Sequence, residues 1–98
     1  MIAHTPGPWF TRREGFSTVY IEARIGGGML QEVAACGPTA AGIGQQKANA
    51  QLIAASPELL EALQSLIDMD IAYQRGPKVS DAVDKARAAI AKATGGTK

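Results

Sequence analysis

The stretch STVYIEARIGGGMLQEVAA, residues 17–35, decides the fold that the sequence predicts. Its first part alternates apolar and polar residues, a pattern typical of a half-buried β-strand. The apolar members of that strand share one face: Val19, Ile21, Ala23 and Ile25. Residues 26–28 are glycines, which adopt positive φ without steric cost, and residues 29–35 offer a second strand. Residues 17–35 are therefore predicted to form a β-hairpin.

The residues that precede the hairpin offer a third strand. Two prolines stiffen the segment HTPGPW, residues 4–9, which is predicted to be an extended arm ending in Trp9. The polar stretch of residues 11–15 is predicted to form a turn. Because an isolated hairpin is marginally stable in water, we expect a strand near residues 9–12 to pair with one edge of the hairpin.

After the hairpin, a glycine-rich connection over residues 36–44 leads into a region with the apolar period of a helix. This region is predicted to contain two to three α-helices, over residues 45–55, 57–74 and 80–94. Ser56 and Pro57 should separate the first two, because serine caps helices and proline is tolerated in a first turn. By the same kind of signal, Gly76-Pro77 should end the second helix and Ser80 should begin the third.

The order of elements, strands first and helices second, predicts an α+β domain with the helices packed on one face of a small antiparallel sheet. At this length we expect a single domain over residues 1–98. Hydrophobic residues make up 46% of the sequence but aromatic residues only 5%, so the core of one chain should be thin. Association of subunits supplements a thin core, and we therefore expect a homo-oligomer.

Charge and hydropathy argue against several classes of partner. The formal net charge is +1 with acids and bases interspersed, so extended binding to nucleic acid is not expected. The N-terminal residues lack a basic region followed by an apolar core, and no stretch reaches the roughly 18 apolar residues of a membrane span. The single cysteine, Cys36, cannot form an internal disulfide and fits a reducing compartment. These features predict a cytosolic protein that does not bind membranes.

No catalytic, metal or cofactor signature is present in the sequence. His4 and Cys36 are the only histidine and cysteine, and they have no companions at the spacing of metal ligands or of a nucleophile and its base. We therefore expect a protein that is not an enzyme. The glycines near residues 42–46 allow a contact with phosphate, but turn glycines are the alternative, since neither GxxxxGK[ST] nor GxGxxG occurs.

Five residues are candidates for contacts with a bound nucleotide: Trp9, Arg12, Arg13, Asn49 and Arg87. Trp9 could stack on a base beside the two neighbouring arginines, or it could seal the core. Asn49 lies close to the apolar stripe of its predicted helix, where an amide needs partners from the preceding loop or from a ligand. Arg87 could face an anionic ligand or solvent.

Three segments carry a resemblance to a known family: HTPGPW at residues 4–9, NAQLIAASPELLEAL at residues 49–63 and KARAAIAKATGG at residues 85–96. Together they resemble a family of small phage and prophage proteins of Proteobacteria, which share a similar HTPGPW start, a helix similar to NARLIAAAPELLEAL and an alanine-rich close. The resemblance implies a phage origin and no particular activity. The layout is also similar to that of the Thoeris anti-defence sponge proteins, which bind signals of the cyclic ADP-ribose type and so keep a host immune effector inactive.

The similarity to sponge proteins implies a phage-encoded, non-enzymatic protein of the host cytoplasm that sequesters a nucleotide immune signal. Trp9 would then serve as the platform for adenine, and the other four candidates would supply cations and an amide. The alternative is a protein-directed inhibitor of a bacterial defence system, similar to anti-CRISPR proteins, which should have an exposed apolar or acidic patch and no small-molecule pocket. A structural or regulatory phage accessory without a ligand is a third possibility.

Overall fold

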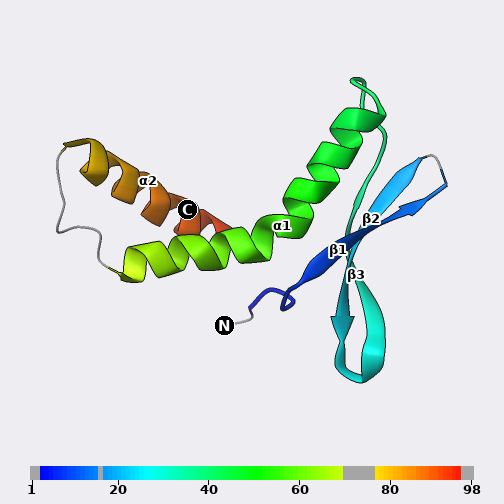
Figure 1. Ribbon diagram of the computed structural model, residues 1–98, viewed down its shortest axis with the longest axis horizontal. Coiled ribbons are helices and arrows are strands. Elements are labelled where there is room, and N and C mark those ends of the chain that lie inside the picture. Colours follow the sequence, from blue (N-terminus) through cyan, green and yellow to red (C-terminus); the bar gives the residue numbers. More distant parts are fainter. Residues whose placement is uncertain (1–2, 16, 70–76, 96–98) are drawn as a thin grey trace. The chain divides into compact units, whose positions relative to one another are not determined.

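The computed structural model describes residues 3–15, 17–69 and 77–95 (Figure 1). Its contacts divide the chain into two compact units, Met1–Glu58 and Leu59–Lys98. Within the described residues, strands precede helices in the order β1 (Trp9–Glu14), β2 (Thr18–Ile25), β3 (Met29–Cys36), α1 (Ile43–Asp68) and α2 (Pro77–Ala93). This order confirms the predicted α+β class. The expectation that the two units fold as one domain stays a prediction.

The first unit contains an antiparallel sheet in the order β1-β2-β3. β1 pairs with β2 from Trp9 opposite Ala23 to Glu14 opposite Thr18, which confirms the predicted third strand. β2 pairs with β3 across a turn of three glycines, and this confirms the predicted hairpin. The polar residues after Trp9 continue the strand instead of forming a turn, because each has a pairing partner on β2. The turn follows at Gly15, which has a φ of 60°.

One face of β2 forms the core of the first unit. Val19, Ile21 and Ala23 are buried, as their alternation predicts. Ile25 is more exposed than expected, at 37%. β1 starts at Trp9, which pairs with Ala23, so Ile25 has no partner on β1. The first half of α1 covers this face with Ala50, which is fully buried. Within the first unit, the predicted packing of a helix on one face of the sheet is therefore confirmed.

A buried amide fastens the start of α1 to the sheet. Gln46 is 2% exposed, and its Nε2 donates hydrogen bonds of 2.9 Å to the carbonyl oxygens of Ser17 and Cys36, at adjacent ends of β2 and β3. Gln46 lies four residues before Ala50 and so shares its face of the helix. Asn49, expected to be the amide in need of partners, is exposed instead because it lies on another face.

Helix α1 runs through Ser56-Pro57, so the predicted division into helices over 45–55 and 57–74 was wrong. Proline has no backbone N–H, and the carbonyl that loses a donor lies four residues earlier, at Ile53. The Ser56 hydroxyl donates a hydrogen bond of 2.6 Å to that oxygen. Serine therefore replaces the missing amide rather than capping a new helix. The last predicted residues of that helix, 70–74, lie outside the described residues.

The second unit contains the last part of α1 and α2. Pro77 is the first residue of α2 and does not end a helix, while its predicted partner Gly76 lies outside the described residues. Ser80 lies inside α2 and not at its start, since proline is accepted in the first turn of a helix and allows an earlier beginning. Val83 is buried. Gly95, with a φ of 77°, follows the helix as predicted.

Candidate binding groove

A groove of about 380 Å³ lies between β1 and α1 in the first unit. One wall consists of three consecutive residues of β1, Trp9–Thr11. The other wall consists of residues on one face of α1: Gln51, Ala54, Ala55 and Glu58. In the part of the chain that the structure describes, β1 is at the edge of the sheet, so the groove follows a strand with one unpaired backbone edge.

The groove is open because small side chains stand opposite a large one. The four helical residues are three, four and seven positions apart and therefore face the same way. Ala54 and Ala55 occupy the middle of that face, and an alanine side chain fills little of the space beside Trp9. The polar groups of Gln51 and Glu58 stand at either end of the helical wall. The result is an apolar floor with polar ends.

Trp9 belongs to the core and to the groove at the same time. It is half-buried against the cluster that contains Ile21 and Ala50. Its Nε1 donates a hydrogen bond of 3.0 Å to the carbonyl oxygen of Thr5, and the ring of His4 meets the indole edge to face at 6.1 Å. The N-terminal arm thus fixes the orientation of the indole.

The arm itself rests on the proline turn of α1. A Cβ atom at Gly7 would lie 3.1 Å from Cβ of Pro57 and 3.0 Å from Oε2 of Glu58, both closer than ordinary contacts. Pro57 is buried. A side chain where the arm crosses the helix would therefore force the arm or Pro57 to shift by a few tenths of an ångström. This contact brings HTPGPW together with the segment that contains Ser56-Pro57.

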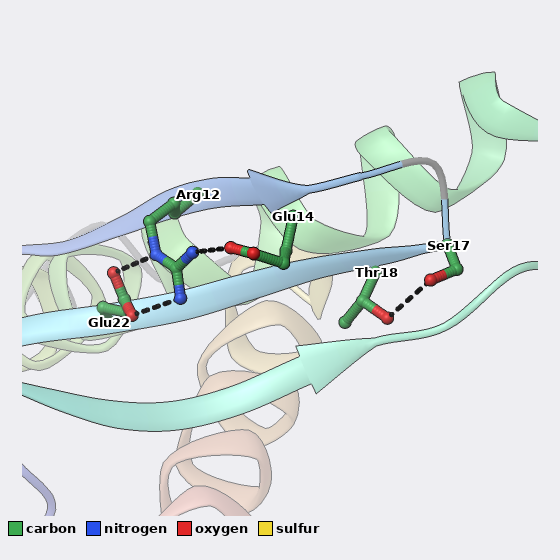
Figure 2. A network of polar contacts seen from close by, with 5 residues as sticks. All are labelled: Arg12, Glu14, Ser17, Thr18 and Glu22. Atoms are coloured by element: carbon green, nitrogen blue, oxygen red, sulfur yellow. Dashed lines mark hydrogen bonds and ion pairs between the residues drawn. The ribbon is translucent and has the colours of Figure 1, made fainter.

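Arg12 points to the opposite face of the sheet from Trp9, since the two are three positions apart on one strand. Its Nε and Nη2 donate hydrogen bonds of 3.0 and 3.1 Å to the two carboxylate oxygens of Glu22, and its Nη1 pairs with Glu14 (Figure 2). The guanidinium also lies over the ring of Tyr20 at 5.0 Å. Hydrogen bonds to Glu22 and then to Glu14 raise the pKa of Arg12 further above its usual range. The charge of Arg12 is thus balanced by two carboxylates.

The other candidate residues occupy separate places. Arg13 is exposed on the same face of β1 as Trp9, two residues beyond Thr11 at the end of the groove wall. Asn49 is exposed on α1. Arg87 belongs to the second unit, where it lines a different groove, of about 540 Å³. A role of these residues in ligand binding stays a prediction.

Sequence reasoning identified Trp9 but missed the helical wall of the groove. The available signal was the spacing of Gln51, Ala54, Ala55 and Glu58, together with the two small residues in its middle. To recognise this wall of the groove, one must know which face of α1 is turned toward the sheet. That orientation depends on Gln46, whose hydrogen bonds join segments far apart in the sequence.

The glycine-rich connection forms a local turn. Gly42 has a φ of 95°, its N–H donates to the carbonyl oxygen of Thr39 at 3.1 Å, and its own carbonyl accepts from the backbone N–H of Gln46 at 3.2 Å. The Thr39 hydroxyl also donates to the Gly42 carbonyl. These bonds and the positive φ favour the turn interpretation of the glycines over a phosphate loop.

Two further properties of the described residues bear on function. They contain no group of three or more His, Cys, Asp or Glu side chains placed to hold a metal ion. None of the helices they form is both long enough and apolar enough to cross a bilayer.

The described residues define a small α+β protein with an open groove beside an edge strand. A family model described as "Salmonella phage P22 protein Y8K6" matches residues 1–97, and the chain belongs to this family of phage proteins. The resemblance to phage proteins is thereby confirmed over almost the whole chain. Neither the curated proteins nor the solved structures contain a match.

Proposed function

We propose that this phage protein is a non-enzymatic binding protein that holds an extended segment of a partner protein in the groove between β1 and α1. The observation that carries the proposal is the groove's construction, with three consecutive residues of an edge strand on one side and one face of a helix on the other. A peptide that adds a strand to an exposed sheet edge uses this arrangement.

The lining indicates which peptide would fit. Backbone hydrogen bonds to the free edge of β1 would supply affinity without regard to sequence. The floor of Trp9, Ala54 and Ala55 suits a small or medium apolar side chain. Glu58 is the one charged residue among those that line the groove, so a basic side chain beside the apolar one would be favoured.

Membership of a phage family supports a partner in the infected bacterium. The proposed role is that of an inhibitor or adaptor directed at a host protein, such as a component of a defence system, in the host cytoplasm. An extended segment is a suitable target because it can be added to the free edge of β1 as a further strand, which needs no enzymatic step.

The test selects binders from a library of random peptides and maps where they bind. We expect selected peptides to carry an apolar residue beside a basic one and to protect from hydrogen exchange those amides of residues 9–11 that point away from β2. Ala55→Arg should fill the groove and weaken binding by about tenfold or more, whereas the matched substitution of an exposed alanine on α2, Ala89→Arg, should not. A library without binders, or peptides that bind the Ala55 variant equally well, would contradict the proposal.

A second candidate function is sequestration of a nucleotide immune signal, of the cyclic nucleotide or cyclic ADP-ribose type. Trp9 favours it, because an indole that lines an open groove offers a stacking surface for a base. The carboxylate of Glu58 in the same groove opposes an anionic ligand, and Arg12 is already paired with two carboxylates. For these reasons it ranks second.

A thermal-shift screen separates the two functions. A signal present at about 100 times its Kd would add about 2.7 kcal/mol to the free energy of unfolding. Stabilisation by one class of cyclic nucleotide that is lost in Trp9→Leu, with the fold retained, would move nucleotide binding to first place. An unchanged midpoint across the panel, together with peptide binding at residues 9–11, would exclude it.

A further inference from the structure

The last part of α1 exposes a row of apolar side chains. Leu59, Leu66 and Met69 are 54%, 51% and 74% exposed, and Ala62, between the two leucines, is also exposed. These residues are three or four positions apart. At 3.6 residues per turn they fall within an arc of about 80° around the helix. They are called the outer stripe below.

The outer stripe is distinct from the side of α1 that faces α2. Leu60, Leu63 and Ile67 are half-buried, and Ile67 lines the groove shared with Ile90 and Ala91 of α2. This part of α1 therefore has two apolar sides in the second unit. One of them is turned toward α2, and the described side chains of α2 leave the outer stripe exposed.

The second unit is at the lower limit of size for a stable hydrophobic core. It spans about 40 residues, a size at which oligomerisation, metals or disulfides usually supplement the core. Among its described residues, Val83 is the one buried hydrophobic side chain, at 3% exposed. Additional burial would come most directly from covering the outer stripe.

We propose that the outer stripe packs against the outer stripe of a second copy of this chain, with the two helices antiparallel. A two-fold axis between positions 62 and 66 sets each Ala62 against Leu66 of the second copy, and each Leu59 against Met69. Each small side chain, Ala62, then lies opposite a large one, Leu66, so that the two helices can pack closely at the centre of the interface. A parallel pairing would set Ala62 against Ala62 and leave a void.

The charge distribution agrees with a symmetric partner. The outer stripe contains no charged residue, as in the cores of protein interfaces. The two acidic residues of this part of α1, Glu61 and Asp68, lie about 120 to 140° around the helix from the centre of the stripe. Two copies can therefore approach along the stripe without bringing these like charges together, and Glu58, one residue before Leu59 and about 60° around the helix from the centre of the stripe, lies at its end.

The first test is the oligomeric state, measured by sedimentation velocity over a wide range of protein concentration. We expect a reversible dimer, and Leu66→Lys should raise its dissociation constant by about tenfold or more. Leu30→Lys is the matched control, because Leu30 is 50% exposed on β3 in the first unit. Far-UV circular dichroism verifies that both variants keep their helices. A wild-type protein that stays monomeric, or an equal effect of the Leu30 variant, would overturn the proposal.

Disulfide formation tests the antiparallel arrangement. In a Cys36→Ser background, a mixture of Ala62→Cys and Leu66→Cys proteins should form mixed disulfide dimers faster than either protein forms dimers with itself. Faster pairing of each variant with itself would indicate parallel helices and overturn the arrangement. Because these substitutions lie outside the peptide groove, failure of this proposal and failure of the proposed function are separate results.

Discussion

Replacing Gln46 by leucine should remove the polar link that holds α1 on the sheet. The side chain is 2% exposed, and its amide satisfies two backbone carbonyls at 2.9 Å each. A typical hydrogen bond contributes about 0.5–1.5 kcal/mol net, and a buried acceptor left without a donor costs about 1–3 kcal/mol. Leucine has a similar size and helix propensity, so the carbonyls dominate the effect. We expect a loss of about 2–4 kcal/mol in the free energy of unfolding.

Urea denaturation measures this loss as a lower midpoint at unchanged slope. In thermal unfolding, a chain of this size loses about 4–8 °C in Tm for each kcal/mol. The control is Gln45→Leu, one position earlier on the exposed side of α1, which should change the free energy by no more than about 0.5 kcal/mol. Equal losses in the two variants, or a loss below about 1 kcal/mol for Gln46→Leu, would refute the assignment of Gln46 as the link.

Three further substitutions test contacts that sequence inspection did not reveal. Gly7→Ala should lower the free energy of unfolding by about 1–3 kcal/mol, because its Cβ meets Pro57; an unchanged urea midpoint would show that the arm moves aside freely. Ser56→Ala should lower the free energy of unfolding, measured by calorimetry, by about 0.5–1.5 kcal/mol, since it removes the donor that replaces the missing amide. The double variant with Pro57→Ala should recover most of that loss, because alanine restores the amide. Arg12→Met should lower the urea midpoint more than Arg13→Met, because it leaves Glu22, 6% exposed, without its cation. Equal effects of the two variants would contradict the pairing of Arg12 with Glu22.

The sheet could be predicted because its signals are local. Alternation marks the buried face of β2, and the three glycines fix the turn to β3. The existence of β1 followed from the instability of a lone hairpin. The residue at which β1 ends could not be predicted, because residues 12–14 are polar whether they pair with β2 or form a turn. Only the pairing register distinguishes the two cases.

The helices were harder to predict because a Ser-Pro pair occurs in two structural contexts. A serine before a proline can cap a new helix, or its hydroxyl can supply the hydrogen bond that proline removes from a continuing one. The two cases have the same local sequence. Here the hydroxyl bonds to Ile53, and Pro57 is buried against the arm at Gly7. A contact between segments far apart in the chain was not visible in the pattern.

The candidate site could be predicted only in part for a similar reason. Trp9 stands out as the single tryptophan at the end of a stiffened arm. Arg12 looked equally available, but the register of β1 on β2 brings it to Glu22 on the opposite face. Charge on a strand can be counted from sequence, whereas its availability depends on which carboxylates the pairing places beside it.

Two of the three segments that carry the resemblance to phage proteins contribute to the walls of the groove. HTPGPW ends in Trp9 on β1, and the helical segment of residues 49–63 contains all four residues of the opposite wall. The arm and the helix also meet at Gly7 and Pro57, beside Glu58. Packing of these segments on each other would explain a glycine and a proline at the crossing. It would not require two adjacent alanines that leave space beside a tryptophan. That space is what an extended partner would use, and it is the feature that the Ala55→Arg substitution removes.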